Sequence, residues 1–199
     1  MIHILPRLDP SGHTTATIYL ARLSELLSLV PQEPLDAGID MLLDAHASGN
    51  RVYVMGNGGS AATASHIAND LMKTCRVPGQ KALRAFALTD NASLLTAWAN
   101  DMAFDRVFAE YLGSVLEPED VVVAISASGN SPNILKGLEM ARLQRARTIG
   151  LLGFDGGAAA DMVDVALVIP SFDYGLVEDA HMATGHAMSI AIRQALETD

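Results

Sequence analysis

The chain has 199 residues, a formal net charge of −10 and a pI of about 4.9, and half of its residues are hydrophobic. Without a cluster of Lys or Arg, this acidic chain lacks the basic surface that non-specific nucleic-acid binding requires. Its single cysteine excludes an intramolecular disulfide, and it has neither a signal-peptide pattern nor an apolar run of about 20 residues, so we expect a cytoplasmic protein with no membrane partner.

The spacing of apolar residues predicts two N-terminal helices, followed by strands that alternate with helices. Residues 1–13 are expected to form a loose arm, and a helix over 14–30 is ended by Pro31 and Pro34 before a second helix at 35–47. Five short apolar strands are expected at residues 51–56, 82–88, 120–126, 147–153 and 165–171. Helical patterns lie between most of these strands or after the last one, at 60–74, 91–115, 131–145, 156–162 and 177–196.

This alternation is typical of a doubly wound α/β domain, in which helices cover both faces of a parallel sheet. We expect that domain over residues 35–199, preceded by an arm and helix over residues 1–34. Ligands of such sheets bind beyond the carboxyl ends of the strands. The turns after the first three strands are therefore candidate ligand sites.

The first of these turns, Gly56-Asn57-Gly58-Gly59-Ser60, leaves a strand and opens a helix. Its glycines permit close approach of the backbone, Ser60 is placed to cap the helix, and the helix N-terminus attracts an anion. The spacing does not match the dinucleotide-binding fingerprint, and the lysine of a P-loop is missing. A glycine turn without a ligand is the alternative for this segment alone.

The turn after the third strand, at residues 126–132, is rich in hydroxyl groups. Ser126, Ser128 and Ser131 surround a glycine just before a predicted helix, and with the free N–H groups they form a nest for a phosphate. Two such turns on separate parallel strands favour a phosphate site over two unrelated helix caps. In the turn after the second strand, a helix cap is the plainer interpretation, and Asp90 is a candidate substrate contact.

Two of the predicted helices carry histidines together with carboxylates. His66 and Asp70 are four residues apart and share one face of their helix. On the last helix, geometry leaves two pairs open, three and seven residues apart: Glu178 with His181, and Asp179 with His186. Imidazole with carboxylate suits zinc binding, or acid–base chemistry without a metal. Taken singly, each histidine is more often a surface or hydrogen-bonded residue than a ligand.

Four stretches of sequence match motifs of one family: GNGGSAATASHIAND, AISASGNSPNILKGLEMAR, TIGLLGFDGG and VEDAHMATGH. Over about residues 35–196 the chain resembles the sugar isomerase (SIS) domain proteins, and within them the phosphoheptose isomerases. The resemblance implies a five-stranded parallel sheet flanked by helices, assembled as a homotetramer with active sites at the subunit interfaces. It implies contacts to a phosphorylated sugar from Asn57, Gly58, Gly59, Ser60, Ser126, Ser128 and Ser131.

The same resemblance implies an aldose–ketose isomerase that converts sedoheptulose 7-phosphate to D-glycero-D-manno-heptose 7-phosphate through a cis-enediol. Asp70 and His186 are implied as the proton-transfer pair. One Zn²⁺ ion per subunit is implied, with the ligands His66, Asp70, Glu178 and His186, and His181 is a secondary candidate.

Three positions depart from the family pattern. Asp70 stands where the family has a glutamate, Glu178 where it has a glutamine, and Ala127 where it has a hydroxyl residue. These changes keep two alternatives open: another phosphorylated sugar in secondary metabolism, or a non-catalytic sugar-phosphate-binding or protein-binding tetramer like the replication-initiator-associating relative. That relative lacks the last histidine, whereas His186 is present here, which favours catalysis.

Overall fold

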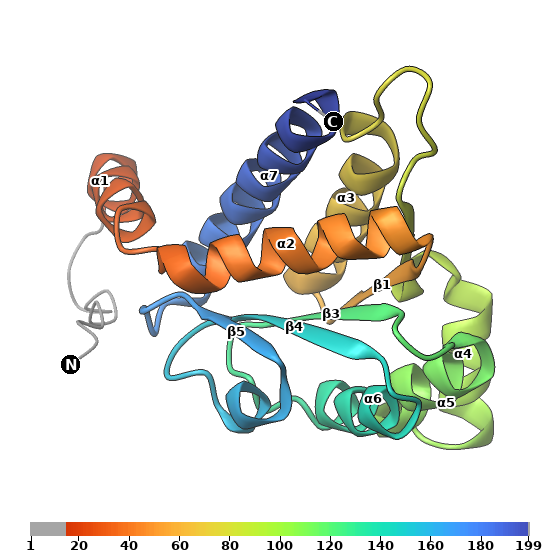
Figure 1. The fold of residues 1–199 in the computed structure, drawn as a ribbon. Coiled ribbons are helices and arrows are strands. Elements are labelled where there is room, and N and C mark those ends of the chain that lie inside the picture. The colour runs from red at the N-terminus through yellow and green to blue at the C-terminus, as the bar shows by residue number, and fades with distance from the viewer. Residues whose placement is uncertain (1–14, 199) are drawn as a thin grey trace.

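A parallel sheet of five strands forms the centre of the computed structural model, which describes residues 15–198 (Figure 1). The strands are β1 (Arg51–Gly56), β2 (Arg84–Ala87), β3 (Val121–Ser126), β4 (Arg147–Leu152) and β5 (Val165–Val168). Their order is β2-β1-β3-β4-β5, and every neighbouring pair is parallel. The chain moves from β1 to one edge of the sheet and then crosses to β3, so the topological switch point lies between β1 and β3.

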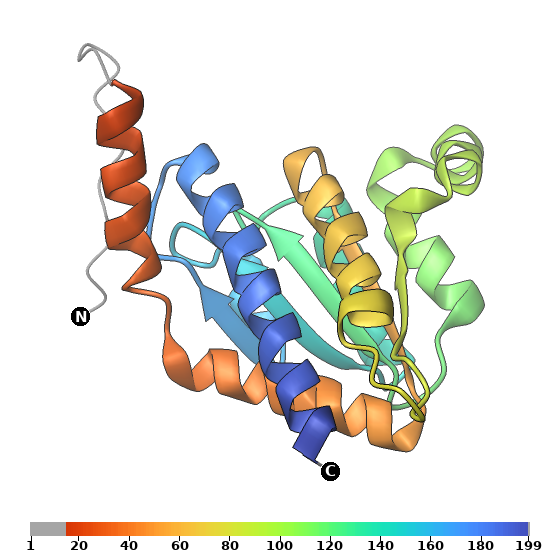
Figure 2. The ribbon, with the colours of Figure 1, turned by 90° about the horizontal axis from the view of Figure 1, so that it is seen from above.

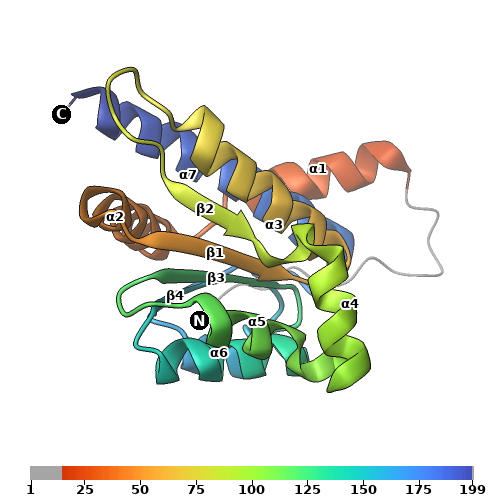
Figure 3. The same cartoon turned by 90° about the vertical axis from the view of Figure 1, so that its right-hand side faces the viewer.

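Helices cover both faces of this sheet, which confirms the doubly wound fold expected from the sequence. They are α1 (Ala16–Leu27), α2 (Gln32–Ser48), α3 (Gly59–Asn69), α4 (Ala92–Asp101), α5 (Val107–Val115), α6 (Pro132–Leu143) and α7 (Tyr174–Thr198). α2, α3 and α7 lie on one face, and α5 and α6 lie on the other (Figures 1 and 3). Side chains of β1 alternate between the two faces. Val52 and Val54 pack in the hydrophobic cluster between the sheet and α2, α3 and α7, and Tyr53 and Met55 pack in the cluster between the sheet and α5 and α6.

The five strands lie where the apolar runs predicted them, but one predicted helix is wrong. Instead of a single helix over 91–115, α4 ends at Asp101, and a 3₁₀ turn at Phe104–Arg106 leads into α5. Met102 and Ala103 leave the helical conformation between them. The change of direction allows α5 to bury Phe108 against the sheet, where tertiary packing overrides the local helical pattern.

The N-terminal helices also differ from the expectation. α1 ends at Leu27, before the prolines, and α2 begins at Gln32 and includes Pro34 in its first turn. A proline is tolerated there because its missing N–H would have no partner within the helix. The predicted boundary between residues 34 and 35 falls in this turn, and Leu26 of α1 is fully buried in the cluster that covers the sheet. The predicted arm at residues 1–13, with His3 and His13, lies outside the described residues.

The remaining helical segments agree with the sequence pattern in place but differ in type or length. The segment predicted at 60–74 is α3 followed by a π-helical turn, Asp70–Thr74. The segment at 156–162 is a 3₁₀ helix, Ala158–Met162, and the last helix begins at Tyr174 rather than at 177. Within residues 15–198, no helix has the length and apolar content needed to cross a membrane.

Candidate active site

The carboxyl ends of β1 and β3 lie side by side, because Gly56 pairs with Ile125 in the parallel register. The turns that follow these strands lead into α3 and α6 and enclose one cavity of about 140 Å³. We call it the serine-lined cavity. Five of the predicted sugar-phosphate contacts line this cavity: Asn57, Ser60, Ser126, Ser128 and Ser131. The two turns that are separated by some 70 residues in the sequence therefore form one pocket at the switch point of the sheet.

The N-termini of α3 and α6 reach this cavity without a side-chain cap. The N-cap residues Gly58 and Ser131 make no side-chain hydrogen bond to the first turn of their helices. Ser60, expected from the sequence to cap α3, lies inside its first turn instead. In α6, Pro132 has no N–H and the Ile134 N–H donates to Asn133 Oδ1 at 3.0 Å, so this end offers fewer free donors than the start of α3. Each helix end carries a partial positive charge of about 0.5. Two such ends beside several hydroxyls suit the cavity to a phosphate, even though no Lys or Arg lines it.

Hydrogen bonds within the two turns hold the cavity in shape. The Asn57 and Asn133 side chains exchange two amide hydrogen bonds of 2.8 Å each and tie the turns together. Ser126 Oγ accepts a hydrogen bond from the Gly129 N–H at 3.1 Å. Gly129 has φ +62°, and a Cβ there would overlap the Gly156 carbonyl, so only glycine fits. The shape of the cavity is therefore largely preorganised.

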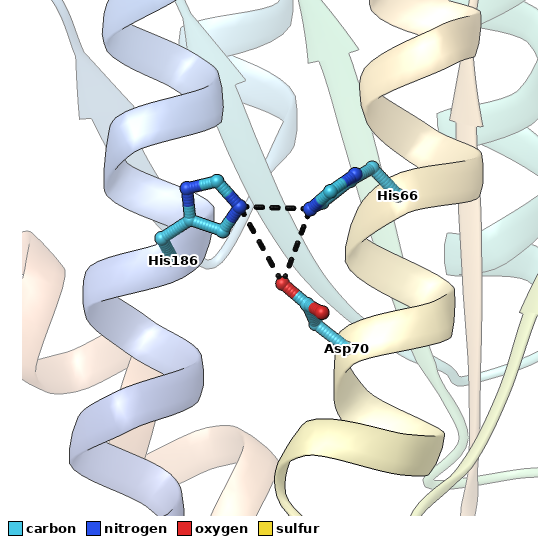
Figure 4. Close-up of side chains that lie close together, drawn as sticks. All are labelled: His66, Asp70 and His186. Carbon is cyan, nitrogen blue, oxygen red and sulfur yellow. Dashed lines mark hydrogen bonds and ion pairs between the residues drawn. The ribbon is translucent and has the colours of Figure 1, made fainter.

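A second group of polar side chains lies farther along α3 and α7, which run side by side (Figure 2). His66 projects from α3, Asp70 from the start of the π-helical turn, and His186 from α7 (Figure 4). The two histidine Nε2 atoms are 2.7 Å apart, and Asp70 Oδ2 lies 3.4 Å from His66 Nε2 and 3.7 Å from His186 Nε2. We call these three residues the His–Asp–His group.

A glycine on α7 makes this approach possible. A Cβ at Gly185 would lie 2.7 Å from Ile67 Cγ1 on α3, closer than real Cβ atoms come to a neighbour. With glycine at this position the two helices touch, and the next residue, His186, faces His66. The sequence places the three side chains on two helices, but the contact between those helices brings them together.

The His–Asp–His group combines a buried acid with two accessible imidazoles. Asp70 is 7% exposed, whereas the side chains of His66 and His186 are 43% and 49% exposed. Tetrahedral zinc with ligand bonds near 2.05 Å places its ligand atoms about 3.3 Å apart. The two distances from Asp70 are close to this value, and rotation of one imidazole ring would widen the third. The two nitrogen donors and one oxygen donor therefore fit a zinc-type ligand set.

Comparison with known proteins agrees with this geometry. The SIS domain family matches residues 18–153. The phosphoheptose isomerase of Pelobacter propionicus is 41% identical over 155 residues, which cover 78% of this chain and 82% of that protein. The phosphoheptose isomerase of Trichlorobacter lovleyi is 42% identical over 159 residues, covering 79% of this chain and 80% of that protein. The chain belongs to the phosphoheptose isomerase family of SIS domain proteins.

Solved structures of the phosphoheptose isomerase family have the same fold. The enzyme from Neisseria gonorrhoeae superposes with a TM-score of 0.81 at 32% identity, covering 88% of this chain and 94% of that one. The enzyme from Francisella tularensis gives a TM-score of 0.82 at 26% identity, covering 91% of this chain and all of that one. Because nearly the whole of each chain is matched, the likeness includes both the sheet and the helices that carry the candidate site.

Glu178, where this member of the phosphoheptose isomerase family departs from the glutamine pattern, lies apart from the His–Asp–His group. Its carboxylate packs against Gly59 at the start of α3, where a Cβ would overlap it, and it lines the serine-lined cavity. Eight residues separate it from His186, about 12 Å along α7. The structure thus brings together three of the four predicted metal ligands and places the fourth in the serine-lined cavity.

His181, the secondary candidate, points into the core. It is fully buried, and its Nε2 donates a hydrogen bond to the Leu152 carbonyl at 3.0 Å. Burial lowers the pKa of His181 to about 4, so this imidazole is neutral near pH 7. The neutral ring packs α7 onto β4.

Asp90 lines a different cavity, beside Phe86 on the edge strand β2. Its Oδ1 accepts a hydrogen bond from Ser65 Oγ at 2.5 Å. The neighbouring Asn91 is the helix cap expected in this turn, because its Oδ1 accepts the Leu94 N–H at 3.1 Å. Within one chain, Asp90 is therefore not part of the serine-lined cavity, and its contact with substrate stays a prediction.

Two residues near the site were not predicted from the sequence. Tyr174 lines the serine-lined cavity because α7 begins there, three residues before the helical pattern predicted it. Thr74 donates a hydrogen bond from its hydroxyl to Asp70 Oδ1 at 2.9 Å. The spacing of four residues between Thr74 and Asp70 was a visible signal, but the same spacing is common in helices where such hydroxyls bond to the backbone.

Proposed function

We propose that this protein is an aldose–ketose isomerase that interconverts sedoheptulose 7-phosphate and D-glycero-D-manno-heptose 7-phosphate. The observation that carries the proposal is the pairing of two sites along α3 and α7. An anion cavity lies at the N-terminus of α3, and the His–Asp–His group lies farther along the same helix. His66 follows Ser60 by six residues, about 9 Å along α3, a span that suits an open seven-carbon chain with a phosphate at its end.

The phosphate end of the substrate is held without a basic side chain. The N–H groups of the first turn of α3 and the Asn133 N–H at the start of α6, with the hydroxyls of Ser60 and Ser131, supply donors from two directions. Because Ser126 and Asn57 are already braced by hydrogen bonds, the cavity keeps its shape before substrate arrives. Binding at this end fixes where the other end of the sugar lies, which is what proton transfer between two carbons requires.

At the other end, Asp70 and His186 are the proposed proton-transfer pair. One of them removes a proton from C1 of the ketose, while the C2 carbonyl oxygen gains a proton, and a cis-enediol results. Return of a proton to C2 and loss of the proton from the C1 hydroxyl give the aldose. Asp70 Oδ2 and His186 Nε2 are 3.7 Å apart and face the same space, so both can reach neighbouring carbons.

We propose that His66, Asp70 and His186 also hold one Zn²⁺ ion per subunit. A bound Zn²⁺ supplies Lewis-acid polarisation of the carbonyl group and stabilises negative charge on oxygen. The chemistry of the three donor atoms and their spacing support this part of the proposal. Glu178 remains the proposed fourth ligand from the family pattern, and it would have to turn away from Gly59 to serve as one.

Assembly into a homotetramer with interfacial active sites belongs to the same proposal, as does a cytoplasmic location. Apolar side chains exposed on two helices support the assembly: Ile18 and Leu20 on α1, and Ile190 on α7. α1 stands at the outer side of α7 (Figures 1 and 2), where a second chain has access to it. The single cysteine, buried and unpaired, agrees with a reducing compartment.

Isomerisation in deuterated water tests the catalytic proposal. Sedoheptulose 7-phosphate is incubated with the protein, with and without added Zn²⁺, and deuterium at C1 and C2 is followed by NMR. We expect deuterium to enter these positions and the aldose to form, and we expect His186→Ala to abolish both. His46→Ala is the matched control, because His46 bonds to the Lys81 carbonyl near the opposite end of the strands.

Two outcomes of this experiment count against the proposal. Wild-type protein that exchanges no deuterium under either condition would leave a sugar-phosphate-binding protein instead of an isomerase. Full activity in His186→Ala would show that the proton transfer takes place elsewhere.

A further inference from the structure

The hydroxyl of Thr74 has a different kind of hydrogen-bond partner from other serine and threonine hydroxyls in the helices of this protein. Thr63, Ser114 and Ser189 each donate to the backbone carbonyl four residues earlier. That is the usual partner for a serine or threonine inside a helix. Thr74 donates instead to a side chain, the Oδ1 atom of Asp70, at 2.9 Å.

The π-helical turn Asp70–Thr74 explains this difference. The Asp70 carbonyl accepts the N–H of Cys75 at 2.9 Å, five residues later, as a π turn requires. The end of the turn is held against α7, because Cys75 Sγ donates a hydrogen bond to the Ser189 carbonyl at 3.3 Å. The turn that presents Asp70 and Thr74 is therefore fixed to the same helix that carries His186.

The bond to Thr74 leaves only one carboxylate oxygen of Asp70 for the His–Asp–His group. Oδ1 accepts the Thr74 hydroxyl, and Oδ2 lies 3.4 Å from His66 Nε2 and 3.7 Å from His186 Nε2. No other hydrogen bond to Oδ1 is present within residues 15–198. Asp70 is 7% exposed, so water cannot readily replace the hydroxyl as a donor.

We propose that Thr74 is a positioning residue for the isomerisation, because its hydroxyl orients the Asp70 carboxylate toward the two histidines. This inference rests on the proposed function. Asp70 has a shorter side chain than the glutamate of the family pattern and reaches the group through one oxygen. A rotation of its carboxylate would therefore change both the proton transfer and the binding of a metal, without changing the phosphate cavity.

Three variants separate this role from a general effect on folding. Thr74→Val removes the hydroxyl and keeps the branched shape, whereas Thr74→Ser keeps the hydroxyl. Thr96→Val is the matched control, since Thr96 is exposed on α4 and its hydroxyl donates to the Ala92 carbonyl. For each protein, kcat and KM with sedoheptulose 7-phosphate are measured, and Co²⁺ affinity is measured by titration of its visible absorption.

We expect Thr74→Val to lower kcat and Co²⁺ affinity by about 10- to 100-fold, the usual cost of losing a partner of a ligand side chain. KM should stay within about twofold of the wild-type value, since the phosphate end is untouched. Thr74→Ser should retain most of the wild-type kcat, and Thr96→Val should match the wild type.

A Thr74→Val variant with wild-type kcat and Co²⁺ affinity would overturn the inference while leaving the proposed function intact. The same conclusion follows if Thr74→Ser fails as badly as Thr74→Val, since the hydroxyl would then not be what matters. A wild-type protein that does not isomerise the sugar phosphate would instead refute the proposed function, and this inference with it.

Discussion

Glu178 is the charged side chain in the cavity proposed to hold a phosphate. Its carboxylate lies against Gly59, and among the described residues it has no hydrogen-bond partner in the cavity. A negative charge at this position opposes a phosphate dianion, and near a protein surface such repulsion amounts to roughly a few kcal/mol at most. The resemblance places a neutral glutamine at this position, so we expect the carboxylate of Glu178 to weaken phosphate binding.

Replacing Glu178 with glutamine should therefore tighten phosphate binding. We expect Glu178→Gln to lower the Kd for sedoheptulose 7-phosphate by about three- to tenfold, measured by calorimetry on metal-free protein. Glu139→Gln on α6 is the matched control for net charge, since Glu139 is exposed and does not line the cavity. Weaker binding by Glu178→Gln would indicate that the carboxylate accepts hydrogen bonds from sugar hydroxyls.

Most residues of the candidate site could be identified from the sequence, but spacing alone did not group them, and the grouping of His66, Asp70 and His186 came from the family resemblance. The serines and glycines stand in two turns that open helices, and that pattern predicts an anion site. On the last helix, spacing alone left Glu178, His181, Asp179 and His186 as alternatives. The structure separates them by burial and contacts: His181 faces β4, Asp179 accepts the Tyr19 hydroxyl at 2.6 Å, and His186 faces His66.

At the scale of elements, the contact between α3 and α7 determines the geometry of the His–Asp–His group. The helices meet where Gly185 packs against Ile67, and a Cβ would come within 2.7 Å of the isoleucine side chain. Ile67 is 6% exposed and has little room to move. The separation of the two helices, and with it the distance between His66 and His186, therefore depends on the absence of a side chain at residue 185.

Gly185→Ala should push the helices apart at this contact. We expect a loss of about 1–3 kcal/mol in the free energy of unfolding, as for other overpacked cores, and a larger relative loss of kcat because His186 moves. Gly113→Ala is the control, because a Cβ there meets only the flexible Met140 side chain at 3.3 Å. The double variant Gly185→Ala with Ile67→Ala, which removes the γ and δ carbons of Ile67, should recover activity, and a Gly185→Ala enzyme as active as the wild type would contradict the role given to this contact.

Helices and strands with a strong local sequence pattern were predicted correctly, and breaks without such a pattern were missed. Buried parallel strands appear as short apolar runs, and all five were located. The break between α4 and α5 was missed, because no proline or glycine marks Met102 or Ala103. The π-helical turn at Asp70 was also missed, since its sequence is compatible with a continuing α-helix and only packing against α7 distinguishes the two.

For the whole molecule, the buried His181 links stability to pH. Burial holds the pKa of His181 at about 4 in the folded protein, whereas an exposed histidine in the unfolded chain has a pKa near 6.5. The unfolded state therefore binds the proton more readily. The contribution to stability is fully present above pH 6.5 and is lost as the pH falls toward 4.

Urea unfolding at pH 7 and pH 5 measures this effect. The His181 contribution should lower the free energy of unfolding by about 2 kcal/mol between these two values, calculated from the two pKa values. His181→Gln, which keeps a donor for the Leu152 carbonyl, should show a correspondingly smaller decrease over the same interval. An equal decrease in both proteins would show that other groups cause the pH dependence.

The order of the strands places both turns of the anion cavity at the switch point, and the packing of α7 on α3 adds the His–Asp–His group. A crystal structure with sedoheptulose 7-phosphate bound tests this combination most directly. We predict the phosphate between the N-termini of α3 and α6, with the carbonyl end of the sugar in hydrogen-bond reach of Asp70 or His186. A phosphate bound outside the serine-lined cavity, or a sugar chain directed away from the His–Asp–His group, would contradict the account.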